Sequence, residues 1–289
     1  MTGARRTAAF PLAAMLAAMA SFQVGAALAK GLYPAVGPQG AATLRLALGA
    51  ALLVAIGRPW RSWPKGAPIL PLIGLGVSAG GAVLFFYMAI ARAPLAIAIS
   101  LQFLGPLAVA VVGSRKVADL LLVFLAALGV WWLVGGGALH TVVDPWGVAS
   151  ALAAACGWAG YILCGRLAGA AFGQRTAALA TCIAAIVVAP AGIAAAGGAL
   201  LAPQIFPLAL LVAVVSTAIP FSLEIYALPR LPARTFAVFT SIEPAFGVIS
   251  GAVLLHETLS IQQIGGVGLI IGAAAGAAWQ GSGSASPLD

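Results

Sequence analysis

Long apolar runs, separated by short stretches rich in glycine, proline and charge, follow one another along the whole chain. Each run has about 20 residues, the length that an α-helix needs to cross a hydrocarbon layer of roughly 30 Å. The alternating pattern of a membrane β-barrel strand is absent, and a segment in lipid satisfies its own backbone only as a helix. The pattern predicts an all-α polytopic membrane protein with ten spans: residues 8–29, 39–57, 69–91, 94–113, 120–138, 146–165, 176–196, 207–228, 235–255 and 261–279.

The chain repeats part of its own sequence at a fixed offset. Moving back by 138 positions places Arg230, Pro232, Pro244 and Gly251 on Arg92, Pro94, Pro106 and Gly113 without a gap. Residues 8–138 and 146–279 are therefore predicted to be two five-helix repeats. Because each repeat has an odd number of spans, the second enters the membrane inverted relative to the first. Secondary transporters built on this plan bind their substrate near the midplane, between the repeats.

The first apolar run also has features of a cleavable signal peptide, since Arg5 and Arg6 precede it and Ala27-Leu28-Ala29 ends it. We interpret it as a membrane span because it is long for a signal. It also has a counterpart at the start of the second repeat: Ala17, Phe22 and Lys30 align with Ala153, Trp158 and Arg166.

The composition agrees with a membrane protein and excludes a large aqueous domain. Hydrophobic residues make up 63% of the chain and charged residues only 7%, with a mean hydropathy of +1.11. The net charge of +8 does not indicate a nucleic-acid partner, because the basic residues lie singly or in pairs between apolar runs. Eleven of the fourteen fall on one side, so both termini are predicted to be cytoplasmic. These eleven are Arg5, Arg6, Arg58, Arg61, Lys65, Arg115, Lys116, Arg166, Arg175, Arg230 and Arg234.

No cofactor or metal is expected. Cys156, Cys164 and Cys182 all lie in apolar segments, where a free thiol behaves as a small hydrophobic group. The phosphate-binding string G-x-x-x-x-G-K-S/T does not occur, which argues against an ATP-driven pump within this chain.

Several polar residues near span ends have the pattern of helix caps. Asp144 followed by Pro145 predicts an N-cap with proline at the first helical position. Ser260 and Gln263 fit a capping box, and Glu257 is expected near a helix N-terminus, where the helix dipole favours a carboxylate.

The remaining ionisable residues inside the spans are Arg45, Glu224 and Glu243. Such residues are costly in lipid unless they are paired or face water, so each is a candidate functional residue. Glu243 lies about 12 Å into its span and Arg45 about 9 Å into its own from the opposite face, at roughly 1.5 Å per residue. We expect Arg45 to bind either Glu243 or a substrate carboxylate. Glu224 lies near the cytoplasmic end of its span and either gates the pathway or pairs with Arg230 or Arg234.

Prolines inside spans point to the same region. A proline leaves the carbonyl four residues before it without its helical partner. Pro106 frees the carbonyl of Gln102, Pro244 that of Thr240, and Pro220 that of Ser216. Freed carbonyls can bind an ammonium group, although a kink that only improves helix packing is the alternative, most of all for Pro220. The candidate substrate-binding set is Arg45, Gln102, Thr240, Ser241 and Glu243.

A family resemblance extends over residues 22–272. The segments SFQVGAALAKGLYPAVG, TLRLALG, LGPLAVAV, GWAGYIL, STAIPFSLEIYALPRLPARTF and SIEPAF resemble the tandem EamA domains of the drug/metabolite transporter superfamily. The resemblance implies a bacterial inner-membrane exporter of small neutral amino acids, such as threonine and homoserine. Gln102 departs from it, because an acid is expected at that position.

Protons are the expected coupling ion, with Glu243, or else Glu224, as the coupling carboxylate. A buried carboxylate that alternately holds a proton and a substrate ammonium would link the two fluxes, whereas a Glu243 permanently paired with Arg45 would be structural. Two other functions remain open: efflux of other amphiphilic metabolites or drugs, and a membrane-embedded enzyme. For the enzyme, His140 and His256 near span ends supply a poor catalytic cluster.

Overall fold

Every regular element is helical in the part of the chain that the computed structural model describes, residues 2–61, 64, 66–112, 117–134, 144–220, 223 and 241–281. The prediction of an all-α protein is confirmed for these residues. The long helices are α1 (Thr2–Ala29), α2 (Tyr33–Gly57), α3 (Ile69–Ile90), α6 (Val117–Val134), α7 (Pro145–Phe172), α8 (Thr176–Ala196) and α13 (Ile261–Gly281). The shorter ones are α4 (Leu95–Gln102), α5 (Leu104–Val112), α9 (Phe206–Ala213) and α12 (Glu243–Leu255).

The helices occupy the positions of the predicted spans. Within the described residues, three helical segments are long and apolar enough to cross a membrane: Phe10–Gly57, Ile69–Ile90 and Pro145–Leu201. The first contains α1 and α2, and the third contains α7 and α8, so each holds two predicted spans. Shorter apolar helices lie at Leu95–Val109, Leu121–Leu133, Phe206–Ala218, Glu243–Leu255 and Ile261–Gly276. The predicted spans 207–228 and 235–255 continue into residues outside the described ranges.

One predicted span is divided in two. The described part of the predicted span 94–113 forms α4 and α5, which are separated at Phe103. Pro106 lies in the first turn of α5 and has no N–H to offer the Gln102 carbonyl, which removes one helical hydrogen bond at the break. A Cβ on Gly105 would collide with the carbonyl oxygen of Ala155, so the start of α5 is pressed against α7.

The ninth predicted span shows a related feature. Helix α12 begins at Glu243, with Pro244 in its first turn. The prediction placed Glu243 about eight residues inside a helix, whereas in the described residues it is the first residue of one. Half-helices that end inside the membrane are a recurrent feature of transporter binding sites.

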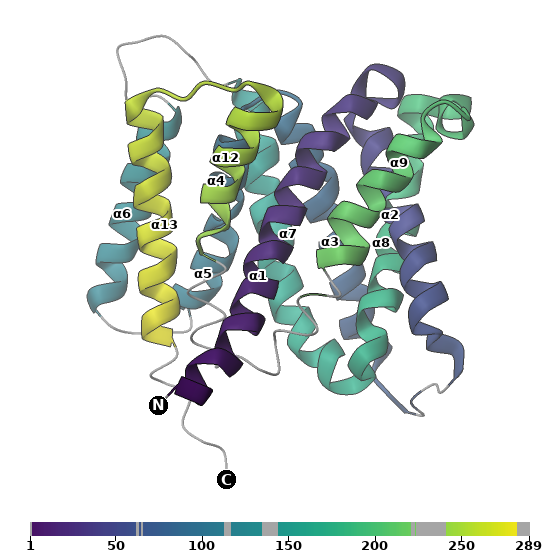
Figure 1. The fold of residues 1–289 in the computed structure, drawn as a ribbon, viewed down its shortest axis with the longest axis horizontal. Helices are drawn as coiled ribbons and strands as arrows, with labels where there is room; N and C mark the ends of the chain where they lie inside the picture. The colour runs from purple at the N-terminus through teal and green to yellow at the C-terminus, as the bar shows by residue number, and fades with distance from the viewer. Residues whose placement is uncertain are drawn as a thin grey trace.

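Helices at aligned positions in the two halves of the chain make similar contacts. Helix α1 packs on α9 and α12, and α7, its counterpart, packs on α3 and α5. The pairs α2 with α8 and α6 with α13 join corresponding helices directly, and α4 packs on α12. Figure 1 shows α1 crossing the bundle, with α6 and α13 on one side of it and α2, α8 and α9 on the other.

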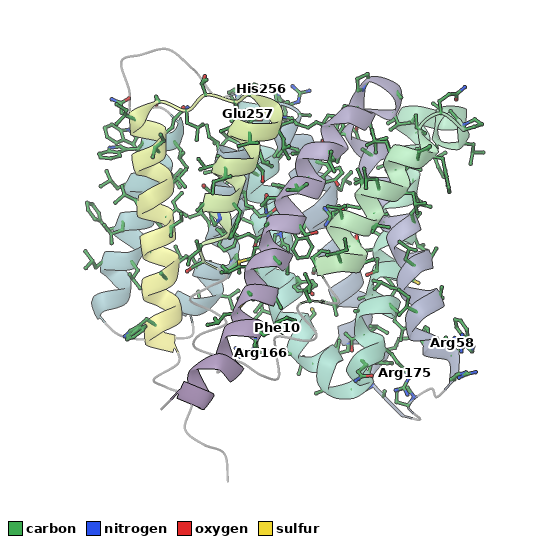
Figure 2. The ribbon with its side chains drawn as sticks, in the orientation of Figure 1. Phe10, Arg58, Arg166, Arg175, His256 and Glu257 are labelled. Atoms are coloured by element: carbon green, nitrogen blue, oxygen red, sulfur yellow. The ribbon has the colours of Figure 1, made fainter. Side chains whose placement is uncertain are left out.

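The two ends of the bundle differ in their charged residues. Helix α1 begins and α13 ends at the same end (Figure 1). Arg58, Arg166 and Arg175 lie at this end, and His256 and Glu257 lie at the opposite one (Figure 2). We call these the basic end and the Glu257 end.

Helix α4 lies at the centre of the bundle. All eight of its residues are buried, and it contacts α3, α7, α12 and α13. Tyr87 of α3 and Leu95 of α4 are fully buried, whereas Phe124 and Leu167 are largely exposed on the outside of the bundle. Exposed apolar side chains of this kind suit contact with lipid tails. The polar residues of functional interest are those buried inside the bundle, near α4.

Candidate functional site

The contact between α4 and α12 brings two predicted site residues to the same level. A Cβ on Gly251 would lie 3.7 Å from Leu95 Cβ, and one on Gly247 would lie 2.7 Å from Ile99 Cγ2, so the helices run antiparallel. Glu243, Gly247 and Gly251 share one face of α12 at four-residue spacing. On α4, Gln102 follows Leu95 and Ile99 on the facing side. One turn beyond the Gly247 contact, Glu243 is therefore level with Gln102.

Glu243 is held by a residue of the first helix. Gln23 of α1 donates from Nε2 to Oε1 of Glu243 at 2.8 Å. The carboxylate also lies in the first turn of α12, where the N–H groups and the dipole of the helix favour negative charge. Gln23 was absent from the predicted site, because it is uncharged and its partner is 220 residues away. The only sequence signal for it is an amide within an apolar run.

Arg45 lies at the middle of α2 and is buried among protein groups. Its Nη2 donates to the Ser216 carbonyl oxygen at 3.0 Å, and its Nη1 makes a longer hydrogen bond of 3.4 Å to the Tyr87 hydroxyl. The guanidinium carbon also lies 5.6 Å from the centroid of the Tyr87 ring, within the range of a cation–π contact. The Tyr33 hydroxyl donates to the main-chain oxygen of Tyr87 at 3.0 Å and holds that residue in place.

The Ser216 carbonyl is available because of Pro220. An α-helix would bond this carbonyl to the N–H of residue 220, and proline has none. The backbone here forms a π-helix, η5 (Val214–Ala218), a conformation that often marks functional sites. The sequence predicted this freed carbonyl but not that Arg45 would bond to it.

Glycines allow the π-helix to approach its neighbours closely. A Cβ on Gly25 of α1 would lie 2.5 Å from Ser216 Cβ, and one on Gly49 of α2 would lie 2.9 Å from Thr217 Cγ2. Ser21 of α1 also donates to the Val215 carbonyl at 2.5 Å. Gly25 is two residues from Gln23, so the contacts of Arg45 and of Glu243 lie along the same part of α1.

Three buried polar atoms near this region have no hydrogen-bond partner among the described residues: Gln23 Oε1, Arg45 Nε and Gln102 Oε1. Their residues are only 3%, 8% and 5% exposed, respectively. Leaving a buried polar group unsatisfied costs about 1–3 kcal/mol. The set offers one donor, on a guanidinium, and two acceptors, on amides, beside the carboxylate of Glu243.

Arg45 and Glu243 do not form an ion pair in this structure. Within the described ranges, ion pairs are formed by Lys30 with Glu257 and by Arg92 with Asp144. The permanent Arg45–Glu243 pair considered from the sequence is therefore not formed in this structure.

The other predicted site residues fall into two groups. Ser241 is buried, two residues before Glu243 in the chain. Thr240 and Glu224 lie outside the described residues, as do Arg230 and Arg234, the expected partners of Glu224.

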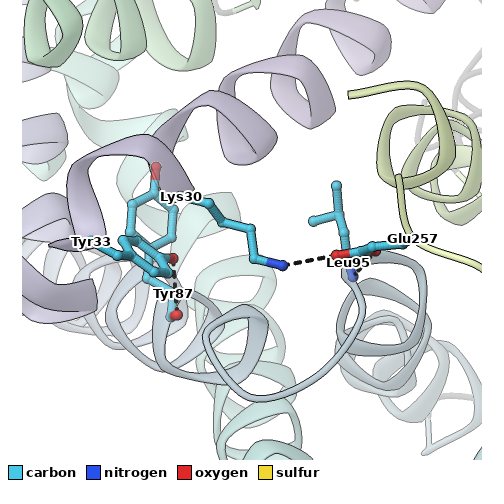
Figure 3. Close-up of polar contacts among 5 residues, drawn as sticks. All are labelled: Lys30, Tyr33, Tyr87, Leu95 and Glu257. Carbon is cyan, nitrogen blue, oxygen red and sulfur yellow. Dashed lines mark hydrogen bonds and ion pairs between the residues drawn. The ribbon is translucent and has the colours of Figure 1, made fainter. Parts of the chain in front are cut away.

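A second polar cluster lies at the Glu257 end (Figure 3). Lys30 Nζ donates to Oε1 of Glu257 at 2.8 Å, and Oε2 of Glu257 accepts from the main-chain N–H of Leu95 at 2.7 Å. Glu257 thus satisfies the N-terminus of α4 and joins it to the end of α1. The sequence placed Glu257 near a helix N-terminus, and the structure shows that the helix is α4, in the other half of the chain.

The shape of the chain after α12 places Glu257 there. His256 adopts a left-handed conformation, with φ of 54°, and ends the helix. The N–H of Glu257 then bonds to the Gly251 carbonyl at 3.0 Å. A Cβ on Gly251 would lie 2.6 Å from Oε2 of Glu257, so only glycine leaves room for the carboxylate.

The two predicted helix caps are confirmed. Asp144 accepts from the Trp146 N–H at 2.8 Å at the start of α7, and it pairs with Arg92 at 3.0 Å. The Trp146 N–H, followed by the Arg92 guanidinium, holds the pKa of Asp144 below its usual value. Ser260 and Gln263 form the reciprocal bonds of a capping box, at 3.0 and 3.1 Å.

A groove of about 530 Å³ lies elsewhere, between α2 and the start of α9. Its lining is apolar: Leu44, Ala47, Leu48, Leu200, Leu201, Pro203, Phe206 and Pro207. None of the predicted site residues contributes to it, so it does not bear on the polar site. Groups of three or more histidine, cysteine, aspartate or glutamate residues able to hold a metal are absent from the described part of the chain.

Comparisons with known proteins agree with the resemblance found in the sequence. Residues 145–279 match the EamA-like transporter family. The chain is 47% identical over 266 residues to the threonine/homoserine exporter RhtA of Escherichia coli (strain K12), covering 92% of this chain and 90% of that protein. It is 48% identical, with the same coverage, to the protein of that name from Salmonella typhimurium (strain LT2). A crystal structure with 21% sequence identity matches 91% of this chain and 95% of its own at a TM-score of 0.62, which supports the fold.

Proposed function

Because the chain belongs to the EamA-like transporter family, we propose that it exports small neutral amino acids, with threonine and homoserine as its first candidates. The family makes it a multi-pass membrane transporter and not an enzyme. The substrate is inferred from relatives named as threonine/homoserine exporters, which match nearly the full length of the chain. We place it in the bacterial inner membrane, with the basic end toward the cytoplasm, because cytoplasmic loops are enriched in lysine and arginine.

The observation that carries this proposal is that a buried guanidinium, on Arg45, and a half-buried carboxylate, on Glu243, lie in the bundle without forming an ion pair. An amino acid is a zwitterion and needs both partners. Arg45 offers its unpaired Nε–H to the substrate carboxylate, and Glu243 offers its charge to the ammonium. Gln102 and Ser241 lie level with or beside Glu243, and we place Thr240 with them by its position in the sequence.

The same residues favour an amino acid over an apolar drug. Arg45, Gln23 and Gln102 each bury a polar atom with no partner elsewhere in the described chain. An apolar ligand would leave all three atoms unsatisfied, whereas a zwitterion can satisfy them. Efflux of amphiphilic compounds is therefore the second candidate.

Proton antiport provides the driving force in our proposal. Glu243 holds a proton when the site faces outward and exchanges it for the substrate ammonium when the site faces inward. Since one carboxylate cannot bind both, the two fluxes are coupled. Glu224 is the alternative coupling residue.

Alternating access follows from the two repeats that we propose, residues 8–138 and 146–279. The similar contacts made by aligned helices of the two halves support a two-fold relation between the halves. In this structure Lys30, Glu257 and the N-terminus of α4 are joined at the Glu257 end, which we assign to the outer face. We infer that this network must open when substrate leaves to the outside.

Purified protein in liposomes tests the proposal. Radiolabelled threonine should move when a pH gradient is imposed, and unlabelled homoserine should compete with it, while apolar drugs should not. Absence of threonine and homoserine flux, together with drug-driven proton movement, would replace the amino-acid assignment by drug efflux. Equal threonine flux with and without a proton gradient would remove the antiport step.

A further inference from the structure

We infer that Gln23 selects primary amines: its Nε2 positions Glu243, and its unpaired Oε1 accepts one N–H of the substrate ammonium. Gln23 is nearly fully buried, donates to Glu243 Oε1 at 2.8 Å, and has no partner for Oε1 in the described part of the chain. This inference rests on the proposed function, because it concerns how an amino acid would be held at that site.

An ammonium group carries three N–H donors, and each must find an acceptor once water is removed. The site supplies three acceptors around one level of the bundle. Glu243 provides a carboxylate, Gln23 provides Oε1 beside it, and Gln102 provides Oε1 on the facing side of α4. Three acceptors match a primary ammonium. An N-methylated amine has one donor fewer and would leave an acceptor unsatisfied.

The amide at position 23 also suits a neighbour that changes its protonation state. When Glu243 is charged, Nε2 of Gln23 donates to it, as seen here. When Glu243 holds a proton, a half-turn of the amide lets Oε1 accept the acid O–H. An amide supports both forms with the carboxyl group in one place, whereas an apolar side chain supports neither. Gln23 is therefore a positioning residue for Glu243 as well as a contact for the substrate.

Helix α1 also contacts the segment that binds Arg45. Two residues after Gln23, Gly25 touches Ser216, whose carbonyl accepts from Arg45. In our proposal, a substrate whose ammonium lies at Gln23 and Glu243 directs its carboxylate toward the Arg45 guanidinium. In the alignment that pairs Phe22 with Trp158, the residue aligned with Gln23 is Ala159. Its side chain has no polar atom that could bind an amine. The Gln23 contact therefore has no counterpart in the second repeat.

The test compares L-threonine with N-methyl-L-threonine in liposomes that contain wild type or Gln23→Met, which keeps the length of the side chain and removes its polar atoms. We expect wild type to prefer threonine, and the ratio of the two kcat/KM values to fall about tenfold in Gln23→Met, mainly through the KM of threonine. Thr43→Val is the matched control, since Thr43 is buried and bonds to Val188 away from the site. It should leave the ratio unchanged.

Gln23→Glu is the second variant and keeps an acceptor at the same place. We expect it to retain the preference for threonine but to change the pH range of export, because its carboxyl group and that of Glu243 then share a proton. If wild type moves threonine and Gln23→Met lowers both substrates equally, Gln23 is only structural and the inference is overturned. If wild type moves no amino acid, the proposed function itself fails. Binding of threonine, followed as a rise in Tm in detergent, gives the same comparison if Gln23→Met is folded but does not transport.

Discussion

The Nη2 of Arg45 donates a 3.0 Å hydrogen bond to the main-chain carbonyl of Ser216. This bond links the middle of α2 to the π-helix, where Pro220 cannot supply the usual helical donor. It places a permanent positive charge inside the bundle while leaving Nε without a partner in the described chain. The arginine is thus held in position by the protein and still has a donor for a ligand.

Replacing Arg45 by lysine should therefore impair transport even though the charge is kept. A lysine ammonium cannot bond the Ser216 carbonyl and a substrate carboxylate in the planar geometry of a guanidinium. Hydrogen bonds to charged groups contribute about 1.5–3 kcal/mol, so kcat/KM for threonine should fall by about 10- to 100-fold in Arg45→Lys. Threonine flux into liposomes gives the measurement.

Arg92→Lys is the control for this change. Arg92 is half-exposed at the Glu257 end and pairs with Asp144, and exposed ion pairs contribute about 0–1 kcal/mol. Its kcat/KM should stay near that of wild type. Normal transport by Arg45→Lys would show that the arginine only supports the π-helix.

The prediction of the fold from the sequence succeeded where each segment must satisfy its own backbone in lipid. Span positions follow from that constraint, so the described helices agree with them. The break between α4 and α5 was harder to place, because it depends on α7 pressing against Gly105 as well as on Pro106.

The hydrogen-bond partners of the candidate site residues were harder to predict than the site residues themselves. Arg45 and Glu243 were evident because charged groups are rare in lipid, but their contacts with Ser216 and Gln23 join residues 171 and 220 positions apart. Gln23 is uncharged and gave no comparable signal. Glu257 was expected at a helix N-terminus, yet that helix begins 162 residues earlier in the chain. Such pairings depend on how the two halves pack.

The close contact of α5 with α7 predicts opposite effects for two glycine substitutions. Gly105→Ala should destabilise the protein, because the added Cβ meets the Ala155 carbonyl and forces the two helices apart. Overpacking of this kind typically costs about 1–3 kcal/mol, which should lower Tm by several degrees in detergent. Gly81→Ala is the control, since a Cβ there meets nothing within 4 Å. It should leave Tm unchanged or raise it, because alanine favours helices by up to about 1 kcal/mol over glycine. Equal Tm values for both variants would contradict the tight α5–α7 contact.

The Lys30–Glu257–Leu95 network predicts that access from the outside depends on Glu257. Ile99 is fully buried between α4 and α12, below this network, and serves as a reporter position. We would introduce Ile99→Cys after replacing the three native cysteines by alanine. Labelling by a membrane-impermeant thiol reagent added outside should be slow with Glu257 intact. It should become at least several times faster with Glu257→Gln, which removes the ion pair, and with Gly251→Ala, which displaces the carboxylate.

Asp144→Asn tests whether any broken ion pair at this end has the same effect. The Arg92–Asp144 pair is more exposed and does not include the Leu95 N–H of α4 that Glu257 binds. Labelling of Ile99→Cys should be nearly unchanged in this variant. Unaltered labelling in both Glu257→Gln and Gly251→Ala would mean that the network does not control access.

Glu243 is predicted to couple export to protons. In Glu243→Gln the side chain can still accept from Gln23 and fits the first turn of α12, so folding and membrane insertion should be normal. The amide cannot release a proton or carry the negative charge that balances an ammonium. We expect pH-driven threonine export to be lost, by about 100-fold or more if a charged hydrogen bond and the coupling step are both removed. Exchange of labelled for unlabelled threonine at equal pH should survive in part, because it needs no proton release.

The comparison of these two assays separates a coupling carboxylate from a structural one. A purely structural Glu243 would lower driven export and exchange by the same factor, or lower neither. Asp144→Asn, the same change of carboxylate to amide outside the bundle core, should retain both activities. Driven export that persists in Glu243→Gln would assign the coupling step to Glu224, and Glu224→Gln should then show the selective loss expected here for Glu243.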